Sequence, residues 1–296
     1  MMLSGVVPAL MTPFTAGGEK YDRNRLRGLC EHLISSRVGG LFVTGTTGEF
    51  IALSPEERRQ VIEDAVEFAG GRTKVIVHAC SYNTMESVAL AEFACRVGAD
   101  GVGSLPPYFH PMDEEAQYAF FSRMCEAVKG RPFYLYNLPA YAANEISLPL
   151  IRRLKAAFPH LKGIKDSSGD LERMKNELEM GLPDFQVVSG ADHRTLDALR
   201  LGAKASVTST ANAFTEVFQA VFGAFNAGDI LRAEQAQQRL TALTKILMSG
   251  RYLATYKTAL RLRGIDIGTV RPPHRELTDS ETHKLTASLK EMGLIP

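Results

Sequence analysis

The chain has 296 residues, 45% hydrophobic and 23% charged, and its 34 basic and 33 acidic residues leave a net charge of +1. This length and composition predict a globular protein with a large core, and a single α/β domain of this size is common. The even balance of charge argues against nucleic acid and against a membrane surface as partners. No apolar run approaches the length of a membrane span, and the first residues lack the pattern of a signal peptide.

The cysteines and histidines give no sign of a metal centre. The four cysteines, Cys30, Cys80, Cys95 and Cys125, show no C-x-x-C spacing and lie in apolar stretches. They are therefore predicted to be reduced, buried thiols of a cytoplasmic protein. The seven histidines are scattered singly, so we predict no metal site.

Short runs of β-forming residues alternate with amphipathic helical segments along the first two-thirds of the chain. We expect strands over residues 6–10, 40–44, 74–80, 101–105, 133–137, 161–165, 185–189 and 205–209. Among the helices between them, one begins with Ser54 as N-cap, Pro55 at the first position and Glu57 completing a capping box. Strands that alternate with helices imply a parallel sheet, and eight such units predict a TIM (β/α)8 barrel.

A doubly wound open sheet is the alternative fold. It would usually carry a glycine-rich phosphate turn after the first strand, where this chain has Pro13-Phe14-Thr15. Pro8 within the first strand is unfavourable for any central strand, since proline cannot donate to the ladder.

The last third of the chain is predicted to be helical. We expect helices over residues 214–226, 229–249, 251–263 and 279–292. A barrel needs only one helix after its last strand. We therefore assign the barrel to residues 1–225 and a C-terminal helical extension, packed on the barrel and available for oligomer contacts, to residues 226–296.

Lys165 ends an apolar stretch and is followed at once by a polar turn. Alternation along a strand places Leu161, Gly163 and Lys165 on one face, where Gly163 leaves room beside the lysine stem. Inside a barrel, desolvation would lower the pKa of this lysine, and the free amine could form a Schiff base with a carbonyl substrate. The alternative is a lysine at a strand end that reaches into solvent.

Further polar groups are expected at the same rim, because chemistry in a TIM barrel sits at the carboxyl ends of the strands. Tyr136 could transfer the proton that Schiff-base chemistry requires. Thr46 and Thr47, with the backbone N–H groups of their Gly-Thr-Thr-Gly turn, could bind an α-carboxylate. Each motif alone also has a purely structural explanation. Tyr136 could be an ordinary core tyrosine, and the Gly-Thr-Thr-Gly segment could be an ordinary turn.

Four motifs, at 45–49, 136–139, 163–165 and 189–190, resemble the signatures of the dihydrodipicolinate synthase / N-acetylneuraminate lyase family in sequence, order and spacing. The resemblance implies a TIM barrel, class I pyruvate chemistry through a covalent imine with no other cofactor, and a homotetramer built from two tight dimers. It implies that Lys165 is the Schiff-base lysine, Tyr136 the catalytic tyrosine, Thr46 the relay hydroxyl, Thr47 a carboxylate ligand and Val207 an apolar wall of the pyruvate site.

Two features of the sequence bear on the substrate. Dihydrodipicolinate synthases usually carry an arginine that holds the aldehyde's carboxylate, and Tyr141 replaces it here, which removes a bidentate clamp. Ser167, Gly190, Asp192 and Ser209 match positions where the lyase branch contacts a polyhydroxylated substrate, although loop capping would also explain Ser167 and Asp192. His193 replaces a glutamate of that branch, which disfavours sialic acid itself.

We therefore predict an aldolase that reversibly cleaves a 2-keto-3-deoxy sugar acid to pyruvate and an aldehyde. One alternative is a 4-hydroxy-tetrahydrodipicolinate synthase that condenses pyruvate with aspartate semialdehyde. Others are a keto-deoxy acid dehydratase using the same imine and a non-catalytic pyruvate-binding protein.

The loop after the fourth strand departs from the family's pattern. The family often places there a tyrosine that completes a proton relay across the dimer, and Phe109 occupies that position. Phenylalanine cannot carry a proton. Tyr108, His110 or a water molecule could take its place, and the sequence leaves this open.

Overall fold

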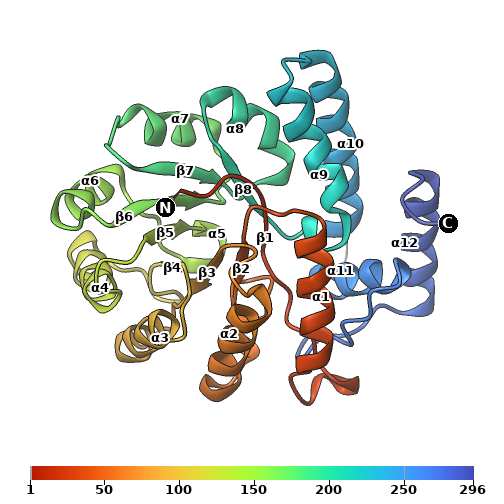
Figure 1. The fold of residues 1–296 in the computed structure, drawn as a ribbon, viewed down its shortest axis with the longest axis horizontal. Helices are drawn as coiled ribbons and strands as arrows, with labels where there is room; N and C mark the ends of the chain where they lie inside the picture. The colour runs from red at the N-terminus through yellow and green to blue at the C-terminus, as the bar shows by residue number, and fades with distance from the viewer. Residues whose placement is uncertain (1, 250) are drawn as a thin grey trace.

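The computed structural model describes residues 2–249 and 251–296 and places a ring of parallel strands at its centre, surrounded by helices (Figure 1). The strands are β1 (Gly5–Pro8), β2 (Leu41–Val43), β3 (Val75–His78), β4 (Gly101–Ser104), β5 (Phe133–Asn137), β6 (Leu161–Asp166), β7 (Gln186–Ser189) and β8 (Ala205–Thr208). Their order is β1-β8-β7-β6-β5-β4-β3-β2, and a bridge between Ala9 and Phe42 joins the two ends. The predicted TIM barrel is confirmed, and the open sheet is excluded.

Pro8 is tolerated because of the direction in which its nitrogen points. The N–H groups of Gly5 and Ala9 donate to carbonyls at β8, whereas that of Leu10 donates to the carbonyl of Phe42 in β2. Pro8 alternates with Ala9, so its nitrogen faces β2, with which β1 forms no continuous ladder. The missing donor therefore removes no bond from the β1–β8 ladder.

The helices of the barrel are α1 (Arg23–Ser35), α2 (Pro55–Ala69), α3 (Thr84–Arg96), α4 (Glu114–Ala127), the short α5 (Pro139–Ala142), α6 (Leu148–Ala157), α7 (Leu171–Glu179), α8 (Thr195–Leu201) and α9 (Ala211–Asn226). Short 3-10 helices span Ala16–Gly18, Phe50–Ala52 and Asp192–Arg194. The predicted capping box of α2 is present: Ser54 Oγ accepts from Glu57 N, and Glu57 Oε2 accepts from Ser54 N.

Three more helices, α10 (Ile230–Met248), α11 (Tyr252–Leu262) and α12 (Asp279–Glu291), follow the barrel and lie to one side of it (Figure 1). Their bounds agree with the expected ranges to within one residue at the ends. The division of the chain into domains at residue 225 remains a prediction. None of the described helices combines the length and apolarity that crossing a membrane requires.

A fully buried ion pair fastens the extension to the barrel. Lys257 of α11 lies 2.8 Å from Glu49, which follows β2, and both side chains are inaccessible to solvent. Lys257 Nζ also donates to the carbonyls of Thr12 and Thr269, and Glu49 Oε2 accepts from the Arg271 N–H. Because removing one partner of such a pair leaves a buried charge uncompensated, these bonds fix the position of α11 against the turn after β2.

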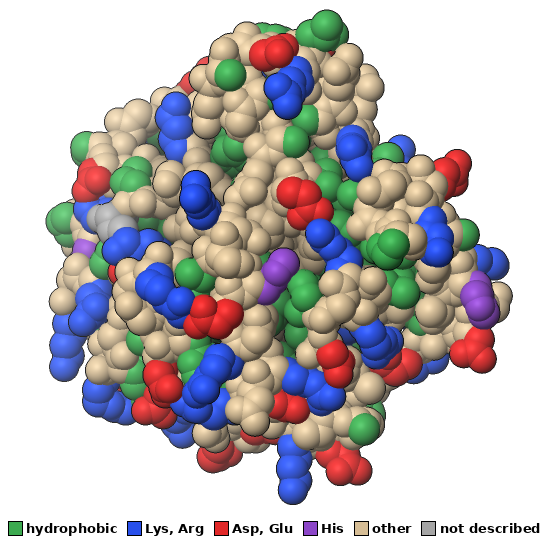
Figure 2. All heavy atoms as spheres, turned by 45° about the vertical axis from the view of Figure 1, so that its right-hand side comes forward, with side chains coloured by type: hydrophobic (Ala, Val, Ile, Leu, Met, Phe, Trp, Pro, Cys, Tyr) green, Lys and Arg blue, Asp and Glu red, His purple; other side chains and the backbone are tan. Residues whose placement is uncertain are grey.

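The distribution of surface charge and the state of the cysteines agree in most respects with the predictions from the sequence. On the face drawn in Figure 2, Lys and Arg side chains are interspersed with Asp and Glu, so neither sign of charge dominates it. The four cysteines are free thiols; Cys30, Cys80 and Cys125 are buried, but Cys95 is only partly buried. The prediction of burial was therefore wrong for Cys95, which lies near the end of α3, a helix with an outward face.

Candidate active site

A cavity of about 260 Å³ opens at the carboxyl ends of the strands, and Lys165 lies in its wall. The sheet register determines its neighbours, because Lys165 of β6 pairs with Tyr136 of β5 on one side and with Val188 of β7 on the other. Residues paired across parallel strands share a face. Lys165 and Tyr136 therefore both project into the barrel mouth.

The amine of Lys165 lies in an aromatic environment. Its Nζ is 3.7 Å from the centre of the Tyr136 ring and 4.5 Å from that of Phe42. No hydrogen-bond acceptor holds it within the described part of the chain. The two ring faces replace only part of the hydration that an ammonium ion would lose. Burial therefore lowers the pKa of Lys165 to about 7, while the nearby Asp192 carboxylate opposes this shift. Near neutral pH a large fraction of the amine is therefore uncharged and nucleophilic.

Gly163 has a different role from the one expected. A Cβ at this position would lie 2.3 Å from the backbone oxygen of Gln186 and 2.9 Å from its Cγ. The space beside Gly163 is thus filled by β7 and not by the lysine stem. Glycine is required here because the two strands approach closely.

The residue after Lys165 fixes the end of β6. Asp166 is fully buried, and its carboxylate accepts hydrogen bonds from Asn137 Nδ2 at 2.8 Å and from Arg173 Nε at 2.9 Å. It also accepts from the N–H and hydroxyl of Ser168. Asn137 follows Tyr136 on β5, so a single buried carboxylate holds the ends of the two strands that carry the amine and the phenol.

Tyr136 presents a buried phenol beside two hydroxyl groups. Burial raises the pKa of Tyr136, while the hydroxyls of Thr46 and Ser167 act in the opposite direction. The ring packs edge-on against Phe42 and His78, with centroids 5.7 and 5.8 Å apart. The Thr46 hydroxyl is itself buried and makes no hydrogen bond that satisfies normal geometry. The phenol is therefore held rigidly and stays protonated at neutral pH.

The turn after β2 places Thr47 in a cluster of hydroxyl groups. Thr47 Oγ1 lies 2.6 Å from Ser209 Oγ and 3.1 Å from the phenolic oxygen of Tyr252, and the latter two are 2.6 Å apart. The N–H groups of Gly48 and Glu49 are used within the turn. The two threonines thus face the cavity as predicted, but Thr47 has a partner, Tyr252, that comes from the extension.

Among the described side chains that line this cavity, Asp192 is the only carboxylate. Its Oδ2 accepts from the hydroxyls of Thr208 at 2.9 Å and Thr210 at 2.6 Å. Burial raises the pKa of Asp192 to about 6, against the effect of these two bonds and of the Lys165 charge. The amine and the carboxylate therefore each stabilise the other's charged form in a buried setting.

Gly190 is confined by its neighbour. A Cβ at this position would lie 1.9 Å from Ser167 Oγ. Only glycine leaves room for that hydroxyl, which in turn lies beside Tyr136.

All the site residues named from the sequence line this one cavity, namely Thr46, Thr47, Tyr136, Tyr141, Lys165, Ser167, Gly190, Asp192, Val207 and Ser209. The sequence missed the contribution of the extension, which adds Thr244 and Met248 of α10 and Tyr252 and Tyr256 of α11. The spacing of Tyr252 and Tyr256, one helical turn apart, was a signal, since it places two phenols on one face of α11. It did not reveal which surface that face covers.

The loop after β4 does not reach this cavity from within the same chain. Phe109 is 77% exposed and has a positive φ of 85°. Tyr108 instead lines an adjoining, mostly apolar cavity of about 580 Å³, which also touches Thr46, Tyr141 and Tyr252. His110 is hydrogen-bonded to the phenol of Tyr82 at 3.0 Å. Neither Tyr108 nor His110 lines the Lys165 cavity.

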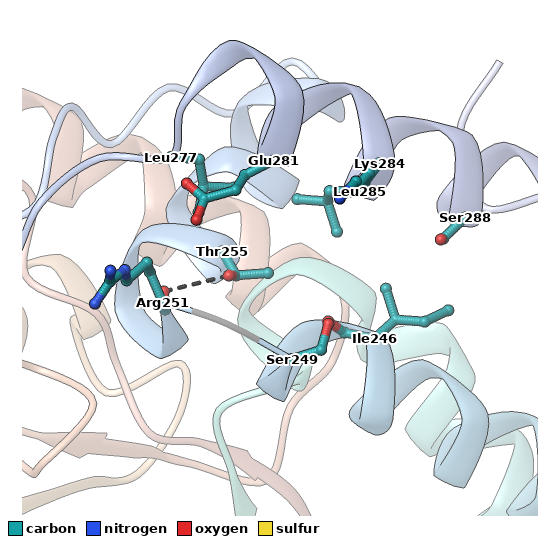
Figure 3. A pocket seen from close by; sticks show the side chains of 9 residues that line it. All are labelled: Ile246, Ser249, Arg251, Thr255, Leu277, Glu281, Lys284, Leu285 and Ser288. Carbon is teal, nitrogen blue, oxygen red and sulfur yellow. Dashed lines mark hydrogen bonds between the residues drawn. The ribbon is translucent and has the colours of Figure 1, made fainter.

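A separate, smaller cavity of about 150 Å³ lies between α12 and the facing ends of α10 and α11 (Figure 3). Its acidic side chain, Glu281, is committed to Arg275 and to the cap of α12 at Thr278. The Thr255 hydroxyl donates to the Arg251 carbonyl, as the dashed line shows (Figure 3). The Lys165 cavity, by contrast, combines a buried amine with a buried phenol, so it is the candidate active site. Across residues 2–249 and 251–296, no three His, Cys, Asp or Glu side chains are grouped as metal ligands.

Comparison with known proteins agrees with this geometry. A model of the dihydrodipicolinate synthetase family matches residues 2–292. The chain belongs to this family. It is 33% identical over 294 residues to the 4-hydroxy-tetrahydrodipicolinate synthase of Methanopyrus kandleri, covering 99% of this chain and 98% of that one.

Solved structures of the dihydrodipicolinate synthetase family superpose over nearly the full length. The Bacillus anthracis dihydrodipicolinate synthase DapA-2 gives a TM-score of 0.94 at 32% identity, covering 100% and 99% of the two chains. YagE, a prophage protein of this family from E. coli K12 solved in complex with pyruvate, gives 0.94 at 26% identity, covering 99% and 100%. The family recognised from the sequence motifs and the enzyme class, a carbon–carbon lyase, are thus confirmed.

Proposed function

We propose that the protein is a Schiff-base-forming aldolase that cleaves a 2-keto-3-deoxy sugar acid to pyruvate and an aldehyde, and that it also catalyses the reverse condensation. Lys165 attacks the keto carbon, and loss of water gives an iminium. A base takes the proton of the C4 hydroxyl, and the iminium accepts the electrons of the C3–C4 bond as that bond breaks, which releases the aldehyde and leaves an enamine. Protonation of the enamine and hydrolysis of the imine then release pyruvate and regenerate the amine.

The observation that carries this proposal is the buried, readily deprotonated amine of Lys165 beside the Tyr136 phenol. The phenol is placed to deliver and take up protons during formation and breakdown of the imine. Thr46 is the relay hydroxyl and Thr47 the carboxylate ligand in this scheme. Val207 forms the apolar wall next to the methyl group of pyruvate. The binding of pyruvate by YagE, a member of the same family, supports this assignment.

The character of the cavity favours a neutral, hydroxylated aldehyde. Apart from Lys165, no lysine or arginine is among its described lining residues, and Tyr141 is one of them. By the sequence resemblance, Tyr141 stands where dihydrodipicolinate synthases usually carry the arginine clamp. Thr244 is buried and lines the cavity, yet its hydroxyl has no hydrogen-bond partner among the residues that the structure describes. Such a group stabilises a ligand that brings a hydroxyl to it. Ser167 and Asp192 offer further partners for sugar hydroxyls.

The test of this function is a panel of pyruvate-release assays over 2-keto-3-deoxy acids of different chain length and stereochemistry. Sialic acid and the condensation of pyruvate with aspartate semialdehyde serve as comparisons. We expect a 2-keto-3-deoxy sugar acid to be preferred over aspartate semialdehyde by roughly 10²-fold in kcat/KM, because a carboxylate without a partner costs about 2–3 kcal/mol. A preference for aspartate semialdehyde would contradict the proposal.

The second candidate is a 4-hydroxy-tetrahydrodipicolinate synthase, the name carried by the relative from Methanopyrus kandleri. The same panel separates the two functions directly. It also detects a dehydratase, which would consume a keto-deoxy acid and release water without releasing pyruvate.

Replacing Thr244 with valine tests the proposed aldehyde site. The shape is kept and the hydroxyl is lost, so kcat/KM for the preferred sugar acid should fall about tenfold. Covalent trapping of pyruvate on Lys165 should not change, and neither should the melting temperature, because no hydrogen bond within the protein is lost. Thr286→Val on α12 is the control. Equal activity of Thr244→Val and the wild type would argue against a contact between Thr244 and the substrate.

The pH dependence of imine formation should follow the Lys165 amine. Because its pKa is lowered to about 7, the rate of reductive trapping with pyruvate should rise with pH through about 7 and level off above. Asp192 favours the ammonium form, so Asp192→Asn should lower the pKa further and move the midpoint to lower pH. Asp197→Asn on α8 is the control. A midpoint that stays in place or moves upward would refute the proposed coupling.

We also propose that the enzyme is a cytoplasmic homotetramer built from two tight dimers. The apolar cavity beside the active site and the exposed side chains of Ile51 (71%) and Phe109 (77%) support a contact with a second copy here. In that arrangement Phe109 would close the partner's site without carrying a proton. Light scattering of the purified protein measures the assembly directly.

A further inference from the structure

Tyr252 is the one phenol of the extension whose partners are all side-chain hydroxyls in the wall of the active-site cavity. With Thr47 and Ser209 it forms a closed triangle whose sides are 2.6, 2.6 and 3.1 Å. Each hydroxyl has one proton and can donate to the next. Within the described chain, no carbonyl or carboxylate accepts a hydrogen bond from these three hydroxyls and so fixes the direction of the bonds between them. The three hydroxyl groups can therefore rotate to donate their protons to a ligand, and no buried carbonyl or carboxylate loses its hydrogen bond when they do.

Tyr256, one turn further along α11, makes an instructive comparison. Its phenol lies 3.1 Å from Thr210 Oγ1, which donates its own proton to Asp192. Tyr256 must therefore donate to Thr210, and its proton is committed to the protein. The two rings pack edge-on with centroids 5.3 Å apart. One phenol of the pair is thus structural, whereas the other, Tyr252, remains free to redirect its proton.

Two separate sets of contacts fix the position of Tyr252 against the turn that carries Thr47. The buried pair of Lys257 and Glu49 fastens α11 to the turn that carries Thr47. Burial raises the pKa of Tyr252 to about 12, even though the neighbouring hydroxyls oppose this. The phenol is therefore a neutral donor throughout the working pH range, held against the turn by a second set of contacts.

We propose that Tyr252 is a further substrate-contacting residue, which donates a hydrogen bond to the carboxylate of the keto acid together with Thr47 and Ser209. This inference rests on the proposed Schiff-base function. A carboxylate held by Thr47 comes within reach of the triangle, because the three oxygens lie together. The phenol is the most acidic of the three hydroxyls and so the best donor. Three neutral donors can then bind the carboxylate in a cavity that lacks an arginine.

The experiment compares two ketones that differ in the carboxylate. Wild type, Tyr252→Phe and the control Tyr118→Phe, on α4 and not in the lining of the cavity, are incubated with cyanoborohydride and either pyruvate or acetone. The rate constant for adduct formation on Lys165 is measured by intact-protein mass. Acetone has the same carbonyl carbon and a methyl group in place of the carboxylate. The phenylalanine variant keeps the ring that packs on Tyr256, and its melting temperature is measured alongside.

We expect Tyr252→Phe to lower the apparent second-order rate constant for pyruvate roughly tenfold and to leave that for acetone unchanged. In turnover, KM should rise while kcat changes little. Equal losses with both ketones, or no loss with pyruvate, would overturn the assignment. So would a fall in kcat with a displaced pH profile and an unchanged KM, since that result identifies a proton carrier. If the wild type forms no adduct with pyruvate, the Schiff-base function itself fails, which is a different result from a variant that matches the wild type.

Discussion

Lys165→Ala should abolish turnover, with a loss on the order of 10⁴-fold or more, because no other side chain of the cavity offers an amine to form the imine. Incubation with pyruvate and a hydride reductant should attach one pyruvate-derived group to the wild type at Lys165 and none to the variant. The fold should survive, since the side chain makes no hydrogen bond among the described residues and its loss leaves the Asp166 contacts in place.

Lys162→Ala is the matched control for this experiment. Lys162 lies on the same strand, three residues earlier, where alternation points it away from the barrel mouth. Its amine pairs with the Asp184 carboxylate at the surface end of β7. We expect this variant to keep full activity and full trapping. Residual turnover in Lys165→Ala above about a hundredth of wild type, or an adduct on another lysine, would rule out the assigned nucleophile.

Tyr136→Phe should lower kcat by roughly 10²–10⁴-fold, the usual contribution of a positioned acid–base group. The ring stays packed between Phe42 and His78, so little stability should be lost. Imine formation and C–C cleavage both need a proton transfer at this site. We therefore expect both the trapping rate and the single-turnover cleavage rate to fall.

The size of that loss decides the role of the phenol. A reduction below about tenfold would show that water or another group carries the proton, and Tyr136 would then be a wall of the cavity. Measuring KM separately distinguishes the two cases, because a lost packing contact raises KM whereas a lost proton donor lowers kcat. Tyr118→Phe again controls for the removal of a phenol elsewhere.

Much of the fold followed from local patterns in the chain. The strands are short runs of mostly buried residues, and helix starts such as Ser54-Pro55-Glu56-Glu57 carry their own caps. Eight such units in a row leave few ways to bury both faces of a parallel sheet. The strand ends then placed Thr46, Tyr136 and Lys165 at one rim, since parallel strands end on the same side.

Other features could not be found in this way, because they depend on contacts between segments far apart in sequence. The extension was expected to serve packing and oligomer contacts, yet it brings Thr244 and Tyr252 into the cavity wall. The spacing of apolar residues along α10 and α11 does not indicate which surface these helices cover. The space beside Gly163 was assigned to the lysine stem, whereas the backbone of Gln186 occupies it.

The sequence by itself therefore determined the barrel and the family, and it singled out the amine and the phenol that we propose as the reacting groups, because strand alternation and capping are local and the motifs lie at strand ends. Only the tertiary structure decided how far the amine is desolvated, which carboxylate it faces in Asp192, and that a phenol from beyond the barrel completes the hydroxyl triangle. The burial of a side chain and its distance from other charged groups depend on how the whole chain packs, so no local segment of the sequence reveals them.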